Sequence, residues 1–276
     1  MFLKKHPLVT GIVTVALCGA AVPVLDGDSV KGIYLRILMS VVCGAAAFSI
    51  SGTKVFEDLD KNIGYVLRWF GGFLIFSAVQ GISGLVVQAS KGMPLVSGWP
   101  KEVCITALYM ISVGLFEELC FRVVINDSLL YSFRDHKYIF VWIALVSSLV
   151  FGYIHVAAYT FSTPSMVAQG VLKTVSAGIT GFALLILYWK TRNFWAIAIA
   201  HALLDGLAYI HVAFFGSNSS GNYVAEGTIV ADGIAYDQGL VMIIYYSGQF
   251  FVNLICALVL IKVLKSIDFE KIRREW

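Results

Sequence analysis

The sequence carries two adjacent glutamates and an arginine inside a long apolar stretch. Glu117, Glu118 and Arg122 all lie in the run GLFEELCFR. On a helix, Glu118 and Arg122 stand at positions i and i+4 with the acid first, the order that favours an ion pair on one face. Glu117 lies about 100° further round the helix and is not aligned with that cation. We therefore expect Glu118 to be structural and Glu117 to be available for chemistry.

Later apolar stretches repeat the same spacing with histidine and aspartate. Phe151 precedes His155 by four residues, and His201 precedes Asp205 by four, so each pair shares one helix face. Ionisable groups inside a membrane span cost several kcal/mol. A carboxylate in such a site without its own cation holds its proton more tightly, which suits a general acid or base. If the three helix faces converge, both histidines and the acids Glu117 and Asp205 surround one polar pocket.

The composition places these groups in a membrane protein. Of 276 residues, 59% are hydrophobic and 13% charged, and the mean hydropathy is +0.82. A soluble domain has about 25% charged residues, so a soluble enzyme, a disordered chain and a disulfide-rich secreted module are excluded. The net charge of +3 is too small to indicate nucleic acid, and we expect no nucleic-acid partner.

The apolar stretches predict an all-α fold, a polytopic membrane helix bundle of about eight transmembrane helices in a single integral membrane domain over residues 1–276. Each stretch has close to the roughly 20 residues that cross a bilayer. In chain order they are 8–25, 33–50, 65–87, 103–125, 138–158, 167–189, 194–215 and 240–264. The candidate chemistry falls on the fourth, fifth and seventh, which gives a catalytic core over residues 103–215.

Charge in the loops indicates the orientation, because Lys and Arg concentrate on the cytoplasmic side. With loops assigned alternately to two sides, most cations fall on the side of both termini. The loop 216–239 contains Glu226, Asp232 and Asp237 but no Lys or Arg. We therefore expect both termini to be cytoplasmic, this loop to be an outer extramembrane segment, and the chain to be a multi-pass protein of the cell (inner) membrane.

Helix rise sets a condition on the depth of the site. At about 1.5 Å per residue, His201 lies about 13 Å from the turn at 190–193, whereas Glu117 lies about 27 Å from the turn near His136. The two groups meet only if the fourth and fifth helices project into the cytoplasm.

The cysteines give no metal or disulfide motif. The sequence has five of them, with no CxxC pair: Cys18, Cys43, Cys104, Cys120 and Cys256. An odd number scattered through apolar stretches argues against a disulfide framework and against a zinc ribbon. We expect them to be small buried apolar residues.

The three pairs of motif residues, in this order on separate apolar stretches, resemble a known family. They match the three motifs of the CAAX protease and bacteriocin-processing family (CPBP, also called Abi): Glu117-Glu118-x-x-x-Arg122, Phe151-x-x-x-His155 and His201-x-x-x-Asp205. The resemblance implies an intramembrane glutamic endopeptidase, similar to the type II CAAX prenyl protease. Such an enzyme would hydrolyse a peptide bond in a membrane-associated peptide or protein tail.

The resemblance also implies roles for individual residues. Catalytic roles fall on Glu117, His155, His201 and Asp205, and site-structuring roles on Glu118, Arg122 and Phe151. Glu117 would activate the attacking water with help from His155, and the third motif would stabilise the oxyanion. That motif often ends in Asn, whereas Asp205 stands here. Because an ionised carboxylate repels an oxyanion, we expect Asp205 to orient His201 and to stabilise its imidazolium.

Other mechanisms and functions stay open at this point. Glu117, His155 and His201 could hold Zn²⁺, since two imidazoles and a carboxylate are a catalytic ligand set. Because the sequence has no HExxH motif, we expect the metal-free glutamate mechanism and no cofactor. A proton-coupled transporter would also need intramembrane acids and histidines, and a non-catalytic membrane scaffold could keep the motif residues for folding.

Overall fold

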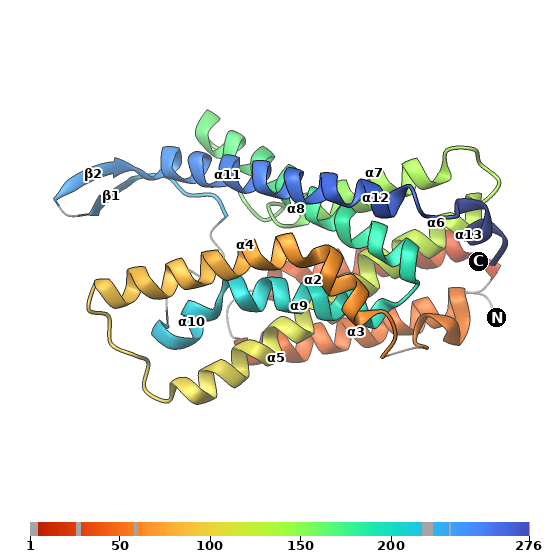
Figure 1. Cartoon of the computed structure of the whole chain (residues 1–276), viewed down its shortest axis with the longest axis horizontal. Helices are drawn as coiled ribbons and strands as arrows, with labels where there is room; N and C mark the ends of the chain where they lie inside the picture. Colours follow the sequence, from red (N-terminus) through yellow and green to blue (C-terminus); the bar gives the residue numbers. More distant parts are fainter. Residues whose placement is uncertain (1–4, 26–28, 58–59, 217–222, 232, 276) are drawn as a thin grey trace.

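A computed structural model describes residues 5–25, 29–57, 60–216, 223–231 and 233–275. The chain is an all-α bundle whose long helices run side by side, with a two-stranded β-hairpin at one end (Figure 1). The elements are α2 (Pro7–Leu25), α3 (Ser29–Ser51), η1 (Gly52–Val55), α4 (Ile63–Ser90), α5 (Trp99–Glu117), η2 (Glu118–Val124), α6 (Ile125–Phe133), α7 (Ile139–Ile154), α8 (Pro164–Thr191), α9 (Phe194–Ala208), α10 (Ile210–Phe215), β1 (Thr228–Ala231), β2 (Ile234–Asp237), α11 (Gln238–Val259), α12 (Ile261–Leu264) and α13 (Phe269–Glu275).

Helix length and composition agree with a multi-pass membrane protein. Five helical segments of the described chain are long and apolar enough to cross a membrane: Val30–Val55, Ile63–Ser90, Trp99–Phe133, Pro164–Thr191 and Gln238–Leu264. Three further apolar helices are shorter: Pro7–Ala21, Ile139–Ile154 and Phe194–Ala208. All eight apolar stretches of the sequence are therefore helical, but the expected number of eight spans is not confirmed.

Two of the expected spans end earlier than their hydropathy suggests. The stretch 138–158 is helical only to the end of α7, because His155 at its C-terminus bonds back to the Phe151 carbonyl. The stretch 194–215 is divided into α9 and α10 at Tyr209. Just before this break α4 comes very close to α9, where a Cβ built on Gly81 would lie 1.9 Å from the Leu207 carbonyl oxygen.

The expected outer loop contains a β-hairpin. Strands β1 and β2 pair antiparallel in the register Thr228↔Asp237 to Ala231↔Ile234, and Gly233 in the turn adopts a φ of 77°. Such left-handed backbone is typical of two-residue hairpin turns. The hairpin lies at the opposite end of the molecule from α13 (Figure 1). Residues 217–222 and 232 of this loop lie outside the described residues.

Side-chain caps explain where two helices begin. The Thr163 hydroxyl accepts the Met166 N–H ahead of α8, and Pro164 follows at the first helical position. Asn193 accepts the Ala196 N–H at 2.9 Å ahead of α9. Polar residues of this kind satisfy amide groups that have no partner within the helix.

Small residues bring the site-bearing helices together. A Cβ built on Gly114 of α5 would lie 2.5 Å from the Ala198 carbonyl oxygen of α9, and one built on Gly152 of α7 would lie 2.1 Å from the Thr174 carbonyl oxygen of α8. Only glycine permits such close backbone approach, the usual basis of helix packing in membranes. The helices that carry Glu117, His155 and His201 are therefore held in close pairs.

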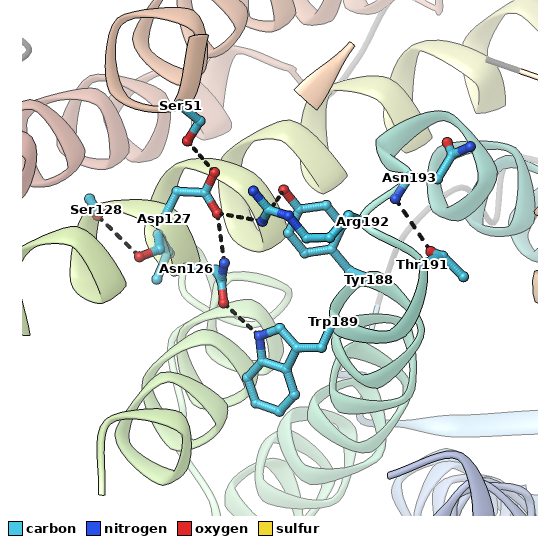
Figure 2. A network of polar contacts seen from close by, with 10 residues as sticks. Ser51, Asn126, Asp127, Ser128, Tyr188, Trp189, Thr191, Arg192 and Asn193 are labelled. Carbon is cyan, nitrogen blue, oxygen red and sulfur yellow. Dashed lines mark hydrogen bonds and ion pairs between the residues drawn. The ribbon is translucent and has the colours of Figure 1, made fainter. Parts of the chain in front are cut away.

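A buried polar network joins α3, α6 and α8 at the end of the bundle where α13 lies. Figure 2 shows Asp127 at its centre: the carboxylate accepts from Arg192 Nη1 at 3.2 Å, from Asn126 Nδ2 at 2.7 Å and from the Ser51 hydroxyl. The Asn126 side-chain oxygen accepts the Trp189 indole N–H at 2.7 Å. Asp127 and Asn126 are fully buried, so these bonds replace water for both side chains.

This network also sets the depth of the site. Asp127 follows Glu118 by nine residues, and His201 follows Arg192 by nine. The two segments are antiparallel, and nine residues of helix span about 13 Å, so the Asp127–Arg192 pair places Glu118 level with His201.

The fourth expected helix continues past Asp127 through the rest of α6, and its projection into the cytoplasm stays a prediction. The apolar start of α7 is not left exposed at Phe140, whose ring packs on Phe269 of α13 at 4.5 Å and on Trp189 at 5.6 Å between centroids. The C-terminal helix therefore covers Phe140, whereas Tyr138, Val141 and Trp142 at the start of α7 are exposed.

We predict that Asp127→Ala destabilises the protein by about 3 kcal/mol, because it removes one partner of a largely buried ion pair. The midpoint of thermal unfolding in detergent measures this. Asp135→Ala is the matched control, since Asp135 is exposed at the end of the same segment, and it should leave the midpoint unchanged. Equal midpoints for the two variants would contradict the register argument.

Candidate active site

The motif with paired glutamates lies where α5 ends, at Glu117, and a π-helical turn begins, at Glu118. Element η2 carries Glu118, Cys120 and Arg122, and every residue of it is buried. π-Helices bond from i to i+5, are rare, and are frequently found at functional sites. The Ser147 hydroxyl of α7 donates to the Phe121 carbonyl oxygen at 3.0 Å, which gives one carbonyl of this turn a partner outside the helix.

The ion pair expected from the spacing is present. Arg122 Nε lies 3.3 Å from Glu118 Oε2, and both side chains are fully buried. The guanidinium also lies over the Phe151 ring, 3.9 Å from its centroid, a cation–π contact that is worth more away from water. Gly181 of α8 makes room for both groups, since a Cβ there would lie 2.7 Å from Phe151 Cδ1 and 2.8 Å from Arg122 Nη2.

Glu118 also binds the histidine of the third motif. His201 Nδ1 lies 2.7 Å from Glu118 Oε1. Since a carboxylate is an acceptor only, the imidazole donates from Nδ1, which fixes the position of one ring proton. Glu118 therefore bridges Arg122 and His201, one oxygen to each.

The other nitrogen of His201 faces two further carboxylates. His201 Nε2 lies 3.7 Å from Glu117 Oε2 and 3.5 Å from Asp205 Oδ2. The side chains of Glu117 and Asp205 are 19% and 27% exposed, whereas those of His201 and Glu118 are 4% and 0% exposed. The cluster is thus closed on the Glu118 side and open on the side of Glu117 and Asp205.

His155 lies beside this cluster. Its Nδ1 donates to the Phe151 carbonyl oxygen at 2.8 Å, and its ring lies 4.9 Å from the Phe151 ring and 5.9 Å from the Tyr223 ring. No hydrogen bond or ion pair joins it to Glu117 within the described part of the chain. The expected convergence of four groups on one point therefore holds for Glu117, His201 and Asp205, with His155 placed beyond Phe151.

The residues considered for zinc do not form a ligand group in this arrangement. Among the described residues, the one set of three His, Cys, Asp or Glu side chains whose donor atoms all lie within 4.8 Å of one another consists of cysteines. The set Glu117, His155 and His201 does not meet that criterion.

Sequence reasoning missed a lysine and a tyrosine at the edge of the site. Lys173 of α8 has its ammonium 4.1 Å from the centroid of the Tyr223 ring, and it interacts electrostatically with Asp205 and Glu117. The available signal was a single cation in the middle of the apolar stretch 167–189. Tyr223 comes from the segment before the hairpin and gave no periodic signal.

The segment that carries Tyr223 is fastened to neighbouring helical regions. The Tyr223 N–H donates to the Tyr159 hydroxyl at 2.9 Å. The amide of buried Gln169 in α8 donates to the Ala225 carbonyl at 3.0 Å and accepts the Ala225 N–H at 2.9 Å. These bonds hold Tyr223 beside His155 and Lys173.

We predict that Gly181→Ala destabilises the protein by about 1 to 3 kcal/mol, because the new methyl group overpacks the contact between Arg122 and Phe151. Thermal unfolding in detergent measures the effect. Gly71→Ala in α4, where nothing lies within 4 Å of the built Cβ, should leave stability equal or raised. A Gly181→Ala protein as stable as Gly71→Ala would show that this contact is not tight.

Comparison with known families agrees with this geometry. The family model described as Type II CAAX prenyl endopeptidase Rce1-like matches residues 99–207. No curated protein and no solved structure matches the chain. The matched region runs from the start of α5 almost to the end of α9 and contains all three motifs. Residues 99–207 are therefore similar to the type II CAAX prenyl endopeptidases of the Rce1-like family.

Proposed function

We propose that this chain is an intramembrane endopeptidase that cleaves a membrane-associated peptide or protein tail with water activated by Glu117. The observation that carries the proposal is the difference between the two adjacent glutamates. Glu118 is fully buried and engaged by Arg122 and His201. Glu117 is partly exposed, and its Oε2 has no hydrogen bond within the described residues. A general base needs a carboxylate that is placed but not already bonded.

In the proposed reaction, Glu117 accepts a proton as the water oxygen bonds to the scissile carbonyl carbon. The carbonyl oxygen becomes an oxyanion and accepts a hydrogen bond from His201. The C–N bond then breaks, and Glu117 returns the proton to the leaving amine. One water is consumed, and a carboxyl and an amino terminus are produced.

The surroundings of His201 suit the role of oxyanion donor. Glu118 holds its Nδ1, and the carboxylates of Glu117 and Asp205 near Nε2 favour a proton at that nitrogen. A donor that is positioned before reaction needs no rearrangement as charge develops. Asp205 then acts by orienting His201 and compensating its charge.

We propose that His155 binds the attacking water. Because its Nδ1 donates to the Phe151 carbonyl, the neutral ring presents Nε2 as an acceptor. That nitrogen would accept a hydrogen bond from the water that Glu117 activates. Phe151 connects the two parts of the site, since its ring contacts the rings of both histidines.

We also propose an orientation of the chain in the membrane. The start of α2 and the end of α13 lie at one end of the bundle, and the hairpin lies at the other (Figure 1). Basic residues Lys265, Lys271, Arg273 and Arg274 lie at the first end. We propose that this end faces the cytoplasm of a cell membrane.

We predict that Glu117→Gln lowers cleavage by more than about 100-fold, the share that a general base commonly supplies, without changing the unfolding midpoint. Glu118→Gln should lower the free energy of unfolding by about 3 kcal/mol, because Arg122 keeps a buried charge without a carboxylate. This loss should appear as a lower midpoint of thermal unfolding. The assay uses protein in liposomes with lipid-anchored peptides, including a prenylated CAAX peptide. Undiminished cleavage by Glu117→Gln would contradict the mechanism.

The same assay separates the alternatives. Cleavage that a chelator abolishes and Zn²⁺ restores would favour the zinc-dependent version, with Glu117, His155 and His201 as ligands after rearrangement. A wild-type protein that cleaves none of the lipid-anchored peptides would favour a proton-coupled transporter or a non-catalytic scaffold.

A further inference from the structure

Three cysteines that are far apart in the sequence meet inside the bundle. Cys18 of α2, Cys43 of α3 and Cys120 of η2 are buried, and their Sγ atoms all lie within 4.8 Å of one another. The Sγ atoms of Cys18 and Cys43 are 3.4 Å apart. The expectation that the cysteines are buried is confirmed for these three and is wrong for Cys104, which is exposed. Cys104 and Cys256 are not part of the cluster.

The sulfur spacing fits a single bound metal ion. A metal–sulfur bond of about 2.3 Å in a trigonal arrangement separates the sulfurs by about 4 Å, within the spread observed here. A disulfide would need a sulfur–sulfur distance of about 2.05 Å, so Cys18 and Cys43 are free thiols. Each thiol comes from a different element, and the cluster is thus formed by tertiary packing.

We propose that Cys18, Cys43 and Cys120 form a binding site for copper(I). Thiolate sulfur selects soft ions, chiefly copper(I) and zinc. Structural zinc sites are almost always tetrahedral with a complete protein ligand set, and the described residues place no further His, Cys, Asp or Glu donor in this group. Copper(I) accepts trigonal thiolate coordination, so a buried site with only these sulfurs suits copper(I) better than zinc.

Charge and position support the assignment. Each thiol that binds copper releases its proton, the ion enters and remains as copper(I), and no electron is transferred. Arg122 on the same turn interacts electrostatically with Cys120, which offsets negative charge from the thiolates. Because Cys120 lies two residues from Glu118, a bound ion would tie α2 and α3 to the turn that carries Glu118 and Arg122.

The test is anaerobic titration of the purified full chain in detergent with copper(I) buffered by bicinchoninate. Wild type should bind one equivalent, with a thiolate-to-copper absorption band in the ultraviolet and a raised unfolding midpoint. Cys18→Ser and Cys43→Ser should each lose at least about tenfold in affinity. The double variant Cys104→Ser/Cys256→Ser is the matched control and should bind as wild type does.

Three results would overturn the proposal. They are binding by wild type no tighter than by Cys18→Ser, binding that depends on Cys104 or Cys256, and preferential binding of zinc when both ions are offered. The wild-type absorption band and stoichiometry remain decisive even if a serine variant fails to fold, because the double variant gives the reference for thiols outside the cluster.

Discussion

The carboxylate of Glu118 is the interaction on which the rest of the site depends. One oxygen accepts the Nδ1 proton of His201 and the other pairs with Arg122. All three side chains are buried, so water cannot replace a missing partner, and the loss of any one leaves polar groups unsatisfied. The bridge leaves Nε2 of His201 directed at Glu117 and Asp205, and it gives two chemically identical neighbours, Glu117 and Glu118, different tasks.

Two structural features make this bridge possible. The π-helical turn η2 places Glu118 and Arg122 together at the buried centre of the bundle, and Gly181 leaves space for the guanidinium over Phe151. The Asp127 network about 13 Å away sets the register between the two antiparallel segments (Figure 2). A shift of one residue there would separate Glu118 from His201.

The fold class and much of the motif geometry could be predicted from the sequence. Apolar stretches of spanning length predict an all-α membrane bundle, which the helices confirm, and i, i+4 spacing predicts the Glu118–Arg122 contact that is present. The roles of the individual residues stay predictions. The π-helical turn was not predictable from spacing, because the same apolar pattern fits both an α-helix and a π-helix. Tertiary contacts, such as the hydrogen bond from Ser147, favour one over the other.

Other features were missed for identifiable reasons. The cysteine cluster depends on how α2, α3 and η2 pack, which no spacing along the chain contains. Lys173 is a lone cation in an apolar stretch. Like the intramembrane acids, such a charge indicates a candidate functional residue. The hairpin had a readable signal, since Asp232-Gly233 between alternating residues is typical of a two-residue turn.

The bridge requires that Glu118 holds the Nδ1 proton of His201. The most direct measurement is the ¹⁵N NMR spectrum of histidine-labelled protein in detergent, with the His201 signals assigned by their loss in His201→Gln. We predict a protonated, hydrogen-bonded Nδ1 in wild type whose ¹⁵N signal shifts in Glu118→Ala. The signal should not shift in Glu57→Ala, a change at an exposed acid after α3. An unprotonated Nδ1 in wild type would contradict this prediction.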